Sequence, residues 1–284
     1  MTDILQEIVA NKRIEVAEEK KNLPLSTLRE WAGSHLSRRP RSMRRALSHA
    51  LRDGSLPSGI IAEFKRRSPS KGLLYRGAEV TEVVPAYEYG GASVCSILTD
   101  EKFFGGSLRD LERARQCVKL PLLRKDFIID EYQVFRSRIS GADAILLIAS
   151  VLSKEECRRL SELATFLQLE VLLELHDEKE LDYINPFVDM VGVNNRHLGT
   201  FHTDVATSFR LSETLRNVLT GEAFSPETSE AIGRPLLVAE SGIDSPETVR
   251  SLRAAGFGGF LIGEAFMKAK DPGEALKTFV EALR

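Results

Sequence analysis

The fold of this chain is decided by the stretch IIAEFKRRSPSKG, which runs from Ile60 to Gly72. Its apolar start, rich in branched residues, predicts a buried strand, and Glu63 and Lys65 alternate with Phe64, so both charges point to the same side. Opposite charges on a buried strand need each other or a ligand, because burying either alone is unfavourable. The serines, proline and glycine that follow predict a mobile loop over an anionic small molecule. A structural ion pair leading into a solvated turn is the alternative.

Length and composition narrow the class of protein. The chain has 284 residues, 43% hydrophobic and 28% charged, as in a globular protein with a substantial core. A formal net charge of -2 gives no overall attraction for nucleic acid or an anionic membrane, so an anion site must be a local cluster. Three cysteines without CxxC or metal-ligand spacing predict a reducing, cytoplasmic compartment with neither structural zinc nor disulfides. No apolar run reaches the roughly 20 residues of a membrane span.

The N-terminal part of the chain is predicted to be helical. Residues 1–21 are typical of an amphipathic helix that ends before Pro24. Residues 25–51 predict further helix, broken at Gly33 and at a basic stretch with five arginines in residues 38–45. Because no aromatic residues alternate with these arginines, a solvated helix face or linker is favoured over a nucleic-acid patch.

From Ile60 onward the sequence repeats a short apolar run, a loop and a helix-forming segment. Continuous apolar runs bounded by turn or capping residues predict strands of a parallel sheet covered by helices. There are eight, at residues 60–64, 93–98, 120–123, 144–148, 170–175, 190–193, 236–239 and 259–262. Eight such units, with no Gly-x-Gly-x-x-Gly turn after the first strand, fit a closed (β/α)8 TIM barrel better than a doubly wound sheet. We therefore expect an α/β fold with a catalytic TIM barrel over residues 56–284 and an N-terminal helical extension, residues 1–55, packing on it.

The connections between the strands carry further signals. Capping-box spacing predicts helix starts after Ser153 and Asp177. Pro85 lies in the first predicted barrel helix and is expected to kink or start it. Residues 200–235 form the longest connection, which we expect to hold a helix and an irregular insert around residues 221–226.

Six of the eight apolar runs end in polar groups. Active sites of such barrels lie at the carboxyl ends of the strands, so these groups are expected to meet at one mouth. They are Glu63 and Lys65, residues 124–126, Glu174, residues 194–196, Glu240 with Ser241, and Gly263 with Glu264. Polar residues in loops are common and could follow several strands by chance. Lys and Glu embedded within apolar runs are not easily explained by chance.

Two glycine turns indicate what the mouth binds. Gly242 follows the seventh run and Gly263 the eighth, where many barrels bind phosphate through backbone N–H groups. Glycines needed only for tight turns are the alternative for each turn taken singly. Both turns together, beside Lys65, favour a phosphate.

Acid and base groups are predicted at the same mouth. A partly dry pocket is expected to move lysine pKa values downward and glutamate pKa values upward, which suits general acid and base work. Lys125 and Glu174, two strands apart, are the predicted pair. Phe104, Phe127 and Leu146 are candidates for an apolar or aromatic wall. Ordinary core is the alternative for each of the three, and the default for Leu146.

Six motifs, in this order, resemble those of the indole-3-glycerol phosphate synthase family. They are EFKRRSPSKG (63–72), LTDEKFFGGS (98–107), LRKDFI (123–128), VNNRHL (193–198), AESGI (239–243) and LIG (261–263). The N-terminal extension is also similar to the one that caps the active-site side of the barrel in that family. The resemblance implies a lyase of tryptophan biosynthesis that needs neither metal nor cofactor. Such an enzyme converts 1-(2-carboxyphenylamino)-1-deoxyribulose 5-phosphate to indole-3-glycerol phosphate, with ring closure and loss of carbon dioxide and water.

The resemblance also implies roles for single residues. It implies Lys125 as the general acid on the ketone oxygen and Glu174 as the general base. Lys65 would pair with the substrate carboxylate or phosphate, while Glu63 and Asn194 would orient substrate and catalytic groups. Further implied positions are Ser68, Arg196, Glu240 and Ser241 at the substrate, Gly242 and Gly263 at the phosphate, and Phe104, Phe127 and Leu146 around the anthranilate ring. Glu264 departs from the pattern, because some members have a serine there that donates to phosphate.

The chemistry agrees with the residues independently of the resemblance. Ring closure creates an alkoxide, so a cation must lie where that charge develops. Three alternatives stay open: phosphoribosylanthranilate isomerase, which would need a Cys at the mouth; a Schiff-base aldolase with Lys125 as nucleophile; and a non-catalytic barrel that binds sugar phosphate. We expect a monomer that binds one anionic small molecule and neither nucleic acid nor membrane.

Overall fold

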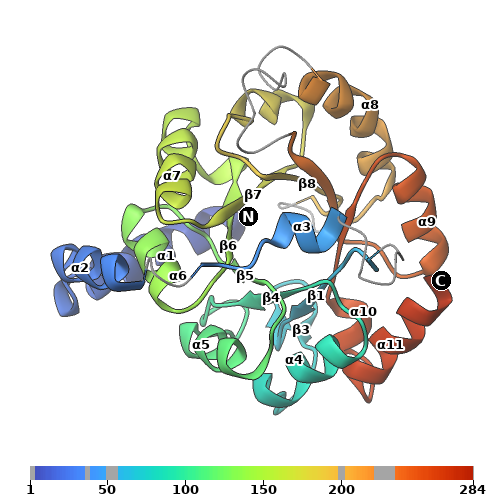
Figure 1. Cartoon of the computed structure of the whole chain (residues 1–284), viewed down its shortest axis with the longest axis horizontal. Coiled ribbons are helices and arrows are strands. Elements are labelled where there is room, and N and C mark those ends of the chain that lie inside the picture. The colour runs from blue at the N-terminus through green and yellow to red at the C-terminus, as the bar shows by residue number, and fades with distance from the viewer. Residues whose placement is uncertain (1–3, 36–38, 49–56, 198–201, 221–233, 284) are drawn as a thin grey trace.

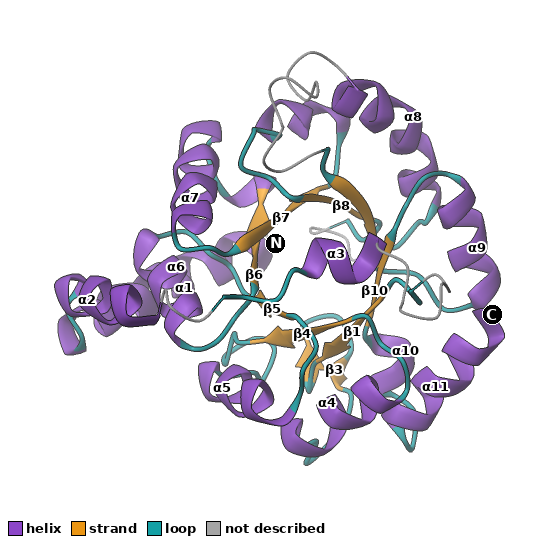
Figure 2. Cartoon of the chain, in the orientation of Figure 1, coloured by secondary structure: helices purple, strands orange, loops and turns teal. Residues whose placement is uncertain are grey.

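The structure is a computed structural model that describes residues 4–35, 39–48, 57–197, 202–220 and 234–283. Eight parallel strands close into a barrel in the order β1-β10-β9-β8-β7-β6-β5-β4, and helices surround it (Figures 1 and 2). The strands are β1 (Ile60–Phe64), β4 (Val94–Leu98), β5 (Leu122–Lys125), β6 (Ala144–Ile148), β7 (Glu170–Leu175), β8 (Met190–Asn194), β9 (Leu236–Glu240) and β10 (Gly259–Ile262). The predicted TIM barrel is confirmed, and all eight apolar runs form its strands.

The helices around the barrel begin largely where the sequence indicates. They are α4 (Val80–Tyr89), α5 (Leu108–Cys117), α6 (Glu131–Ile139), α7 (Lys154–Phe166), α8 (Ala206–Thr220), α9 (Pro246–Ala254), α10 (Glu264–Met267) and α11 (Pro272–Leu283), with 3-10 turns η1 (Ala149–Val151) and η2 (Glu178–Tyr183). The capping boxes at Ser153 and Asp177 are both formed. Pro85 lies inside α4 and does not start it. The expected helix before the insert is α8, whereas residues 221–226 lie outside the described part of the chain.

Strand periodicity separates the core into two layers. In β6, Ile145 and Leu147 belong to the layer between strands and helices, while Leu146 points into the barrel. Other barrel-interior residues occupy matching positions: Ile61, Val94, Leu123, Leu172, Val238 and Leu261. Because side chains alternate along a strand, the residue two positions later faces the same interior, nearer the mouth. Two positions after these interior residues, at the same end of the barrel, lie Glu63, Lys125, Glu174, Glu240 and Gly263.

The N-terminal extension contains α1 (Ile4–Asn22), α2 (Leu25–His35) and α3 (Met43–Ser48). Helix α1 ends before Pro24, as predicted. The expected break at Gly33 is wrong, because α2 continues through it. Leu28 and Ala32 of α2 are buried, and the helix packs against α6. This packing outweighs the penalty of about 1 kcal/mol for a glycine inside a helix.

The extension covers both ends of the barrel, whereas the resemblance implied only the active-site side. Helix α3 lies across the opposite opening (Figure 1), where Met43 and Leu47 join the barrel interior. The basic stretch before α3 is not simply solvated: the Arg41 guanidinium donates to the carbonyls of Val118 and Leu120 at 3.0 and 3.3 Å. Arginine there tethers the extension to the barrel. Among the described helices, none is long and apolar enough to cross a membrane.

Candidate active site

A cavity of about 600 Å³ opens at the carboxyl ends of the strands. It is lined by every site residue predicted from the sequence: Glu63, Lys65, Ser68, Phe104, Lys125, Phe127, Leu146, Glu174, Asn194, Arg196, Glu240, Ser241, Gly242 and Gly263. Residues up to 200 positions apart therefore meet around one space, because parallel strands of a barrel all end at the same rim.

Lys125 lies between two buried carboxylates. Its Nζ is 3.3 Å from Glu174 Oε2 and 3.4 Å from Glu240 Oε2. Burial alone lowers the pKa of Lys125, but the carboxylates of Glu240 and Glu174 outweigh it and raise the pKa above its ordinary value. The expectation of a lowered lysine pKa is thus wrong for Lys125. This lysine is therefore a firmly protonated cation.

The two carboxylates beside Lys125 differ in their other partners. Glu174 also accepts a hydrogen bond from Asn194 Nδ2 at 3.0 Å, and His176 Nε2 lies 3.3 Å from it. Burial raises its pKa, but Lys125 and His176 outweigh burial, so the pKa of Glu174 is lowered, contrary to expectation. Glu240 Oε1 has no hydrogen-bond partner within the described ranges. Burial, with the nearby charge of Glu174, outweighs the lowering effect of Lys125, and the pKa of Glu240 rises to about 8.

A second pair of opposite charges comes from β1 and the residue after it. Lys65 Nζ donates to Glu63 Oε1, as the alternation of the sequence predicted. Although burial raises the pKa of Glu63, the charges of Lys65 and Lys125 lower it further than burial raises it. Glu63 is consequently an anion that holds Lys65 at the rim of the cavity.

The segment after β1 was predicted as a mobile loop and a poor continuation of a strand. It contains a short antiparallel ribbon, β2 (Arg67–Ser68) with β3 (Gly72–Leu73). The Arg66 guanidinium anchors its start by hydrogen bonds of 2.6 and 3.0 Å to Asp110. The tip of the ribbon faces the cavity, and its mobility stays a prediction.

The turns after β9 and β10 lie side by side at the far end of the cavity. Ser241 and Gly242 both have left-handed backbone, at φ 65° and 74°, and a Cβ on Gly242 would lie 2.6 Å from Thr203 Cγ2. Gly263 is needed for a different reason, because a Cβ at that position would lie 2.5 Å from Glu63 Oε1. Backbone turns of this kind present N–H groups to anions.

Glu264 faces these turns and does not point away from the site. It accepts from Arg196 at 3.1 Å and from Lys268 at 2.6 Å. Arg196 also donates to Ser70 Oγ at 3.1 Å, which connects the β2–β3 ribbon to the turn after β10. The carboxylate of Glu264 is therefore already paired with two cations at this part of the cavity, Arg196 and Lys268.

The opposite end of the cavity is apolar. The rings of Phe104 and Phe127 lie 6.0 Å apart between centroids, and Leu146 lines the same wall from β6. Ser70 and Lys71 line the cavity from the predicted loop, and further lining residues were not predicted singly from the sequence: Ile4, Leu5 and Ile8 of α1, His202, Thr203 and Lys268. The apolar residues of α1 indicate a buried face, and the resemblance implied that the extension caps the active-site side, but neither singled out these three residues as lining the cavity. His176 beside Glu174 was also missed, although it follows β7 directly.

No group of three or more His, Cys, Asp or Glu side chains in the described part of the chain is arranged to hold a metal ion. The polar groups at the centre of the cavity instead include Lys65 and Lys125, the carboxyl groups of Glu63, Glu174 and Glu240, and the Asn194 amide. Fold and site define the class: a TIM-barrel enzyme with acid and base groups at the carboxyl ends of its strands.

Comparisons with known proteins give the family. A family model described as indole-3-glycerol phosphate synthase matches residues 5–279. The chain is 53% identical over 284 residues to indole-3-glycerol phosphate synthase of Bacteroides thetaiotaomicron, with 100% of both chains covered. It is 41% identical to that of Polaromonas naphthalenivorans, covering 97% of this chain and 98% of the relative. This chain belongs to the indole-3-glycerol phosphate synthase family.

Solved structures confirm the fold. The tryptophan synthase alpha-subunit of Pyrococcus furiosus (a D110N mutant) superposes with a TM-score of 0.56 at 14% identity, covering 80% of this chain and 98% of that chain. The activity that the family defines is a carbon–carbon lyase step of tryptophan biosynthesis. In it, 1-(2-carboxyphenylamino)-1-deoxyribulose 5-phosphate closes to indole-3-glycerol phosphate, losing carbon dioxide and water.

Proposed function

We propose that Lys125 is the general acid of this reaction and Glu174 its general base. The observation that carries this assignment is the position of Lys125 Nζ between Glu174 and Glu240. As the aromatic carbon attacks the ketone, negative charge grows on the oxygen, and a fixed cation with a proton to donate lowers the energy of that transition state. Loss of carbon dioxide then restores the aromatic ring, and Glu174, held by Asn194, is an ionised carboxylate able to take the proton that is removed as the hydroxyl leaves as water.

The two ends of the cavity suggest how the substrate lies. Its phosphate would accept from the backbone at Ser241, Gly242 and Gly263, and its anthranilate ring would lie on the wall of Phe104, Phe127 and Leu146. Lys65 stands between these ends on the rim and would pair with an anionic group of the substrate. Glu63 would orient Lys65, and Ser68, Arg196 and Glu240 would contact the substrate. A cavity of about 600 Å³ suits a ligand of this size.

The Schiff-base alternative is disfavoured by the same geometry. An amine nucleophile must lose its proton, and two carboxylates that raise the pKa of Lys125 oppose this loss. The isomerase alternative lacks its Cys, because Cys95 lies buried within β4 and Cys117 and Cys157 lie on helices.

The proposal extends to the organisation of the protein. We propose that residues 1–55 are an extension of the barrel domain, residues 56–284, since Ile8 and Met43 both pack into its interior. We also propose a monomer in a reducing cytoplasm, in keeping with three unpaired cysteines. Light scattering of the purified protein measures its oligomeric state, and a dimer at micromolar concentration would contradict the proposed monomer.

Fluorescence detection of indole-3-glycerol phosphate tests the assignment directly. Purified protein should form product from the substrate, and borohydride should trap no substrate adduct on Lys125. A trapped adduct on Lys125 would favour the aldolase mechanism and refute the acid role.

A further inference from the structure

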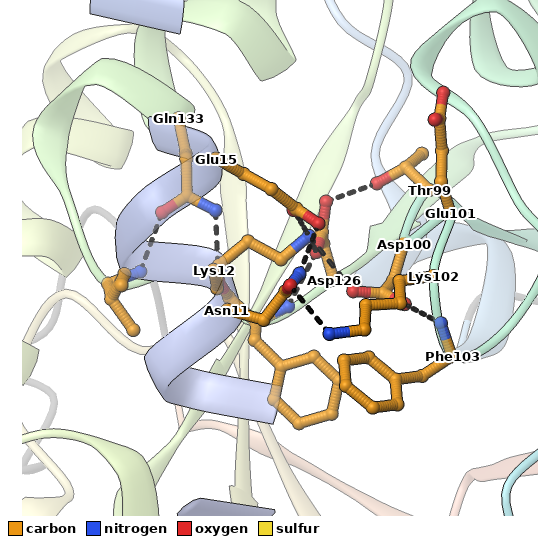
Figure 3. A network of polar contacts seen from close by, with 12 residues as sticks. Asn11, Lys12, Glu15, Thr99, Asp100, Glu101, Lys102, Phe103, Asp126 and Gln133 are labelled. Atoms are coloured by element: carbon orange, nitrogen blue, oxygen red, sulfur yellow. Dashed lines mark hydrogen bonds and ion pairs between the residues drawn. The ribbon is translucent and has the colours of Figure 1, made fainter. Parts of the chain in front are cut away.

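Helix α1 carries a buried cation, Lys12, whose side chain reaches the loops after β4 and β5. The side chain of Lys12 is 5% exposed, and its Nζ lies 3.0 Å from Asp100 Oδ2 and 3.0 Å from Asp126 Oδ1. Figure 3 shows Lys12 reaching from α1 toward these carboxylates, with Glu15 of the same helix beside it. Burying a lysine is unfavourable unless its partners hold it closely, so this arrangement is a specific one.

The two aspartates belong to different loops and are themselves buried. Asp100 follows β4 and Asp126 follows β5, and their side chains are 0% and 1% exposed. Arg124 also neutralises Asp126, at 2.8 Å, whereas Lys12 is the cation that the described residues provide for Asp100. Burial lowers the pKa of Lys12, but Asp126 and Asp100 outweigh burial and raise it, so the cation persists at all physiological pH values. Without it, two carboxylates would face each other with a single cation.

Each aspartate holds the backbone of a segment that lines the cavity. Asp126 Oδ1 accepts from the N–H of Phe127 at 2.8 Å, and Asp100 Oδ1 accepts from the N–H of Phe103 at 2.8 Å. Phe104 follows directly, and its ring contacts that of Phe127. Lys12 is thus connected to the Phe127 ring through Asp126 and to the Phe104 ring through Asp100 and Phe103.

We propose that Lys12 is a positioning residue, which fixes the spacing of the two loops that carry Phe104 and Phe127 and so shapes the pocket for the anthranilate ring. It touches neither substrate nor reacting atoms, and it acts through Asp100 and Asp126. The proposal deepens the proposed function, on which it rests for the place of the ring. It gives α1 a part in substrate recognition beyond closing the cavity with Ile4, Leu5 and Ile8.

The test compares Lys12→Met with Lys20→Met in the full-length protein. Lys20 is on the same helix and also ties α1 to the barrel, through Asp130 at 2.7 Å, but its side chain is 38% exposed and lies away from the cavity. Anthranilate binding measured by calorimetry reports on the aromatic wall. Inhibition by inorganic phosphate reports on the other end of the cavity. We expect Lys12→Met to weaken anthranilate binding and raise KM by about tenfold or more, with phosphate inhibition within about twofold of wild type. Lys20→Met should change neither ligand by more than about twofold.

Equal effects of the two variants, or equal loss of anthranilate and phosphate binding in Lys12→Met, would show a merely structural helix contact and overturn the proposal. If Lys12→Met does not fold, Lys12→Met combined with Asp100→Asn removes the uncompensated charge. That double variant should fold and still bind anthranilate about tenfold more weakly, because the loops stay untied. Wild-type anthranilate affinity in it would be decisive against the idea. The calorimetric readout of anthranilate binding is independent of turnover, so failure of the acid–base assignment would be seen separately, in the Lys125 variants.

Discussion

Lys125 Nζ lies 3.3 Å from Glu174 Oε2, although the two residues are 49 positions apart in the chain. Both face the barrel interior two residues beyond an apolar interior side chain, and β5 and β7 end at the same rim. The pair places a protonated amine and an ionised carboxylate within reach of one substrate. The two residues form a buried ion pair, which a bound substrate must rearrange in order to reach either group.

Replacing Lys125 should separate chemistry from binding. Lys125→Ala is expected to lower kcat by about a thousandfold or more, since it removes both the proton donor and the charge beside the alkoxide. KM should change little. Lys65→Ala is expected to lower kcat and raise KM together, because Lys65 is proposed to hold an anionic group of the substrate. Lys154→Ala, at an exposed ion pair with Asp182, is the control and should match wild type. Near-normal turnover of Lys125→Ala would refute the acid assignment.

Glu240 should impose a pH dependence on activity. Its pKa is raised to about 8, so it loses its proton as the pH rises through that value. The new carboxylate then competes with the substrate oxygen for Lys125, and kcat/KM is expected to fall above about pH 8. In Glu240→Gln that inflection should vanish, while the fold is retained. Rate profiles between pH 6 and about 10 for both proteins make the comparison. An identical inflection in the two would assign it to another group.

Glu264 should weaken phosphate binding. Its carboxylate holds Arg196 and Lys268 beside the glycine turns and repels a second anion there. We expect Glu264→Ser to tighten competitive inhibition by inorganic phosphate by about tenfold, as removal of one nearby like charge predicts. Glu274→Ser removes an exposed carboxylate paired with Lys277 and should leave inhibition unchanged. Weaker inhibition in Glu264→Ser would mean that Glu264 is needed to hold Arg196 in place.

Asp189 should make stability depend on pH at the opposite end of the barrel. Burial is the main cause that raises its pKa, from 3.8 to about 7, while its Oδ2 accepts from the N–H of Val171 at 2.8 Å. A folded-state pKa above the unfolded value contributes stability that is complete below about pH 4 and is lost as the pH rises through about 7. Asp189→Asn keeps an acceptor and does not titrate.

We therefore compare the free energy of unfolding in urea of Asp189→Asn with that of wild type at two pH values. The difference, variant minus wild type, should be larger at pH 8 than at pH 4 by on the order of 2 kcal/mol, after allowance for partial exposure. Asp182→Asn, at a side chain that is 76% exposed, is the matched control and should show no such trend. A constant difference between Asp189→Asn and wild type at both pH values would contradict the raised pKa.

Much of the fold could be predicted because it depends on local patterns. Short stretches of sequence are enough to predict the eight apolar runs, the capping boxes at Ser153 and Asp177, and the end of the first helix before Pro24. Gly33 was misjudged because helix propensity is weak, and packing of α2 on α6 overrides it. The convergence of Lys65, Lys125 and Glu174 could also be predicted, since the barrel topology fixes where strand ends meet.

The sequence by itself determined the order of strands and helices, the barrel they close and the residue types at its mouth, because periodicity, caps and turns act over a few positions. Only the tertiary structure decided which charges become neighbours. It placed Lys125 between two glutamates, so the pKa of the lysine rises and that of Glu174 falls, while burial and the neighbouring Glu174 raise the pKa of Glu240. It also brought Lys12 to Asp100 and Asp126 and sent α3 to the far end of the barrel. Coulombic and burial effects depend on distances in space, and these arise only when the chain has closed upon itself.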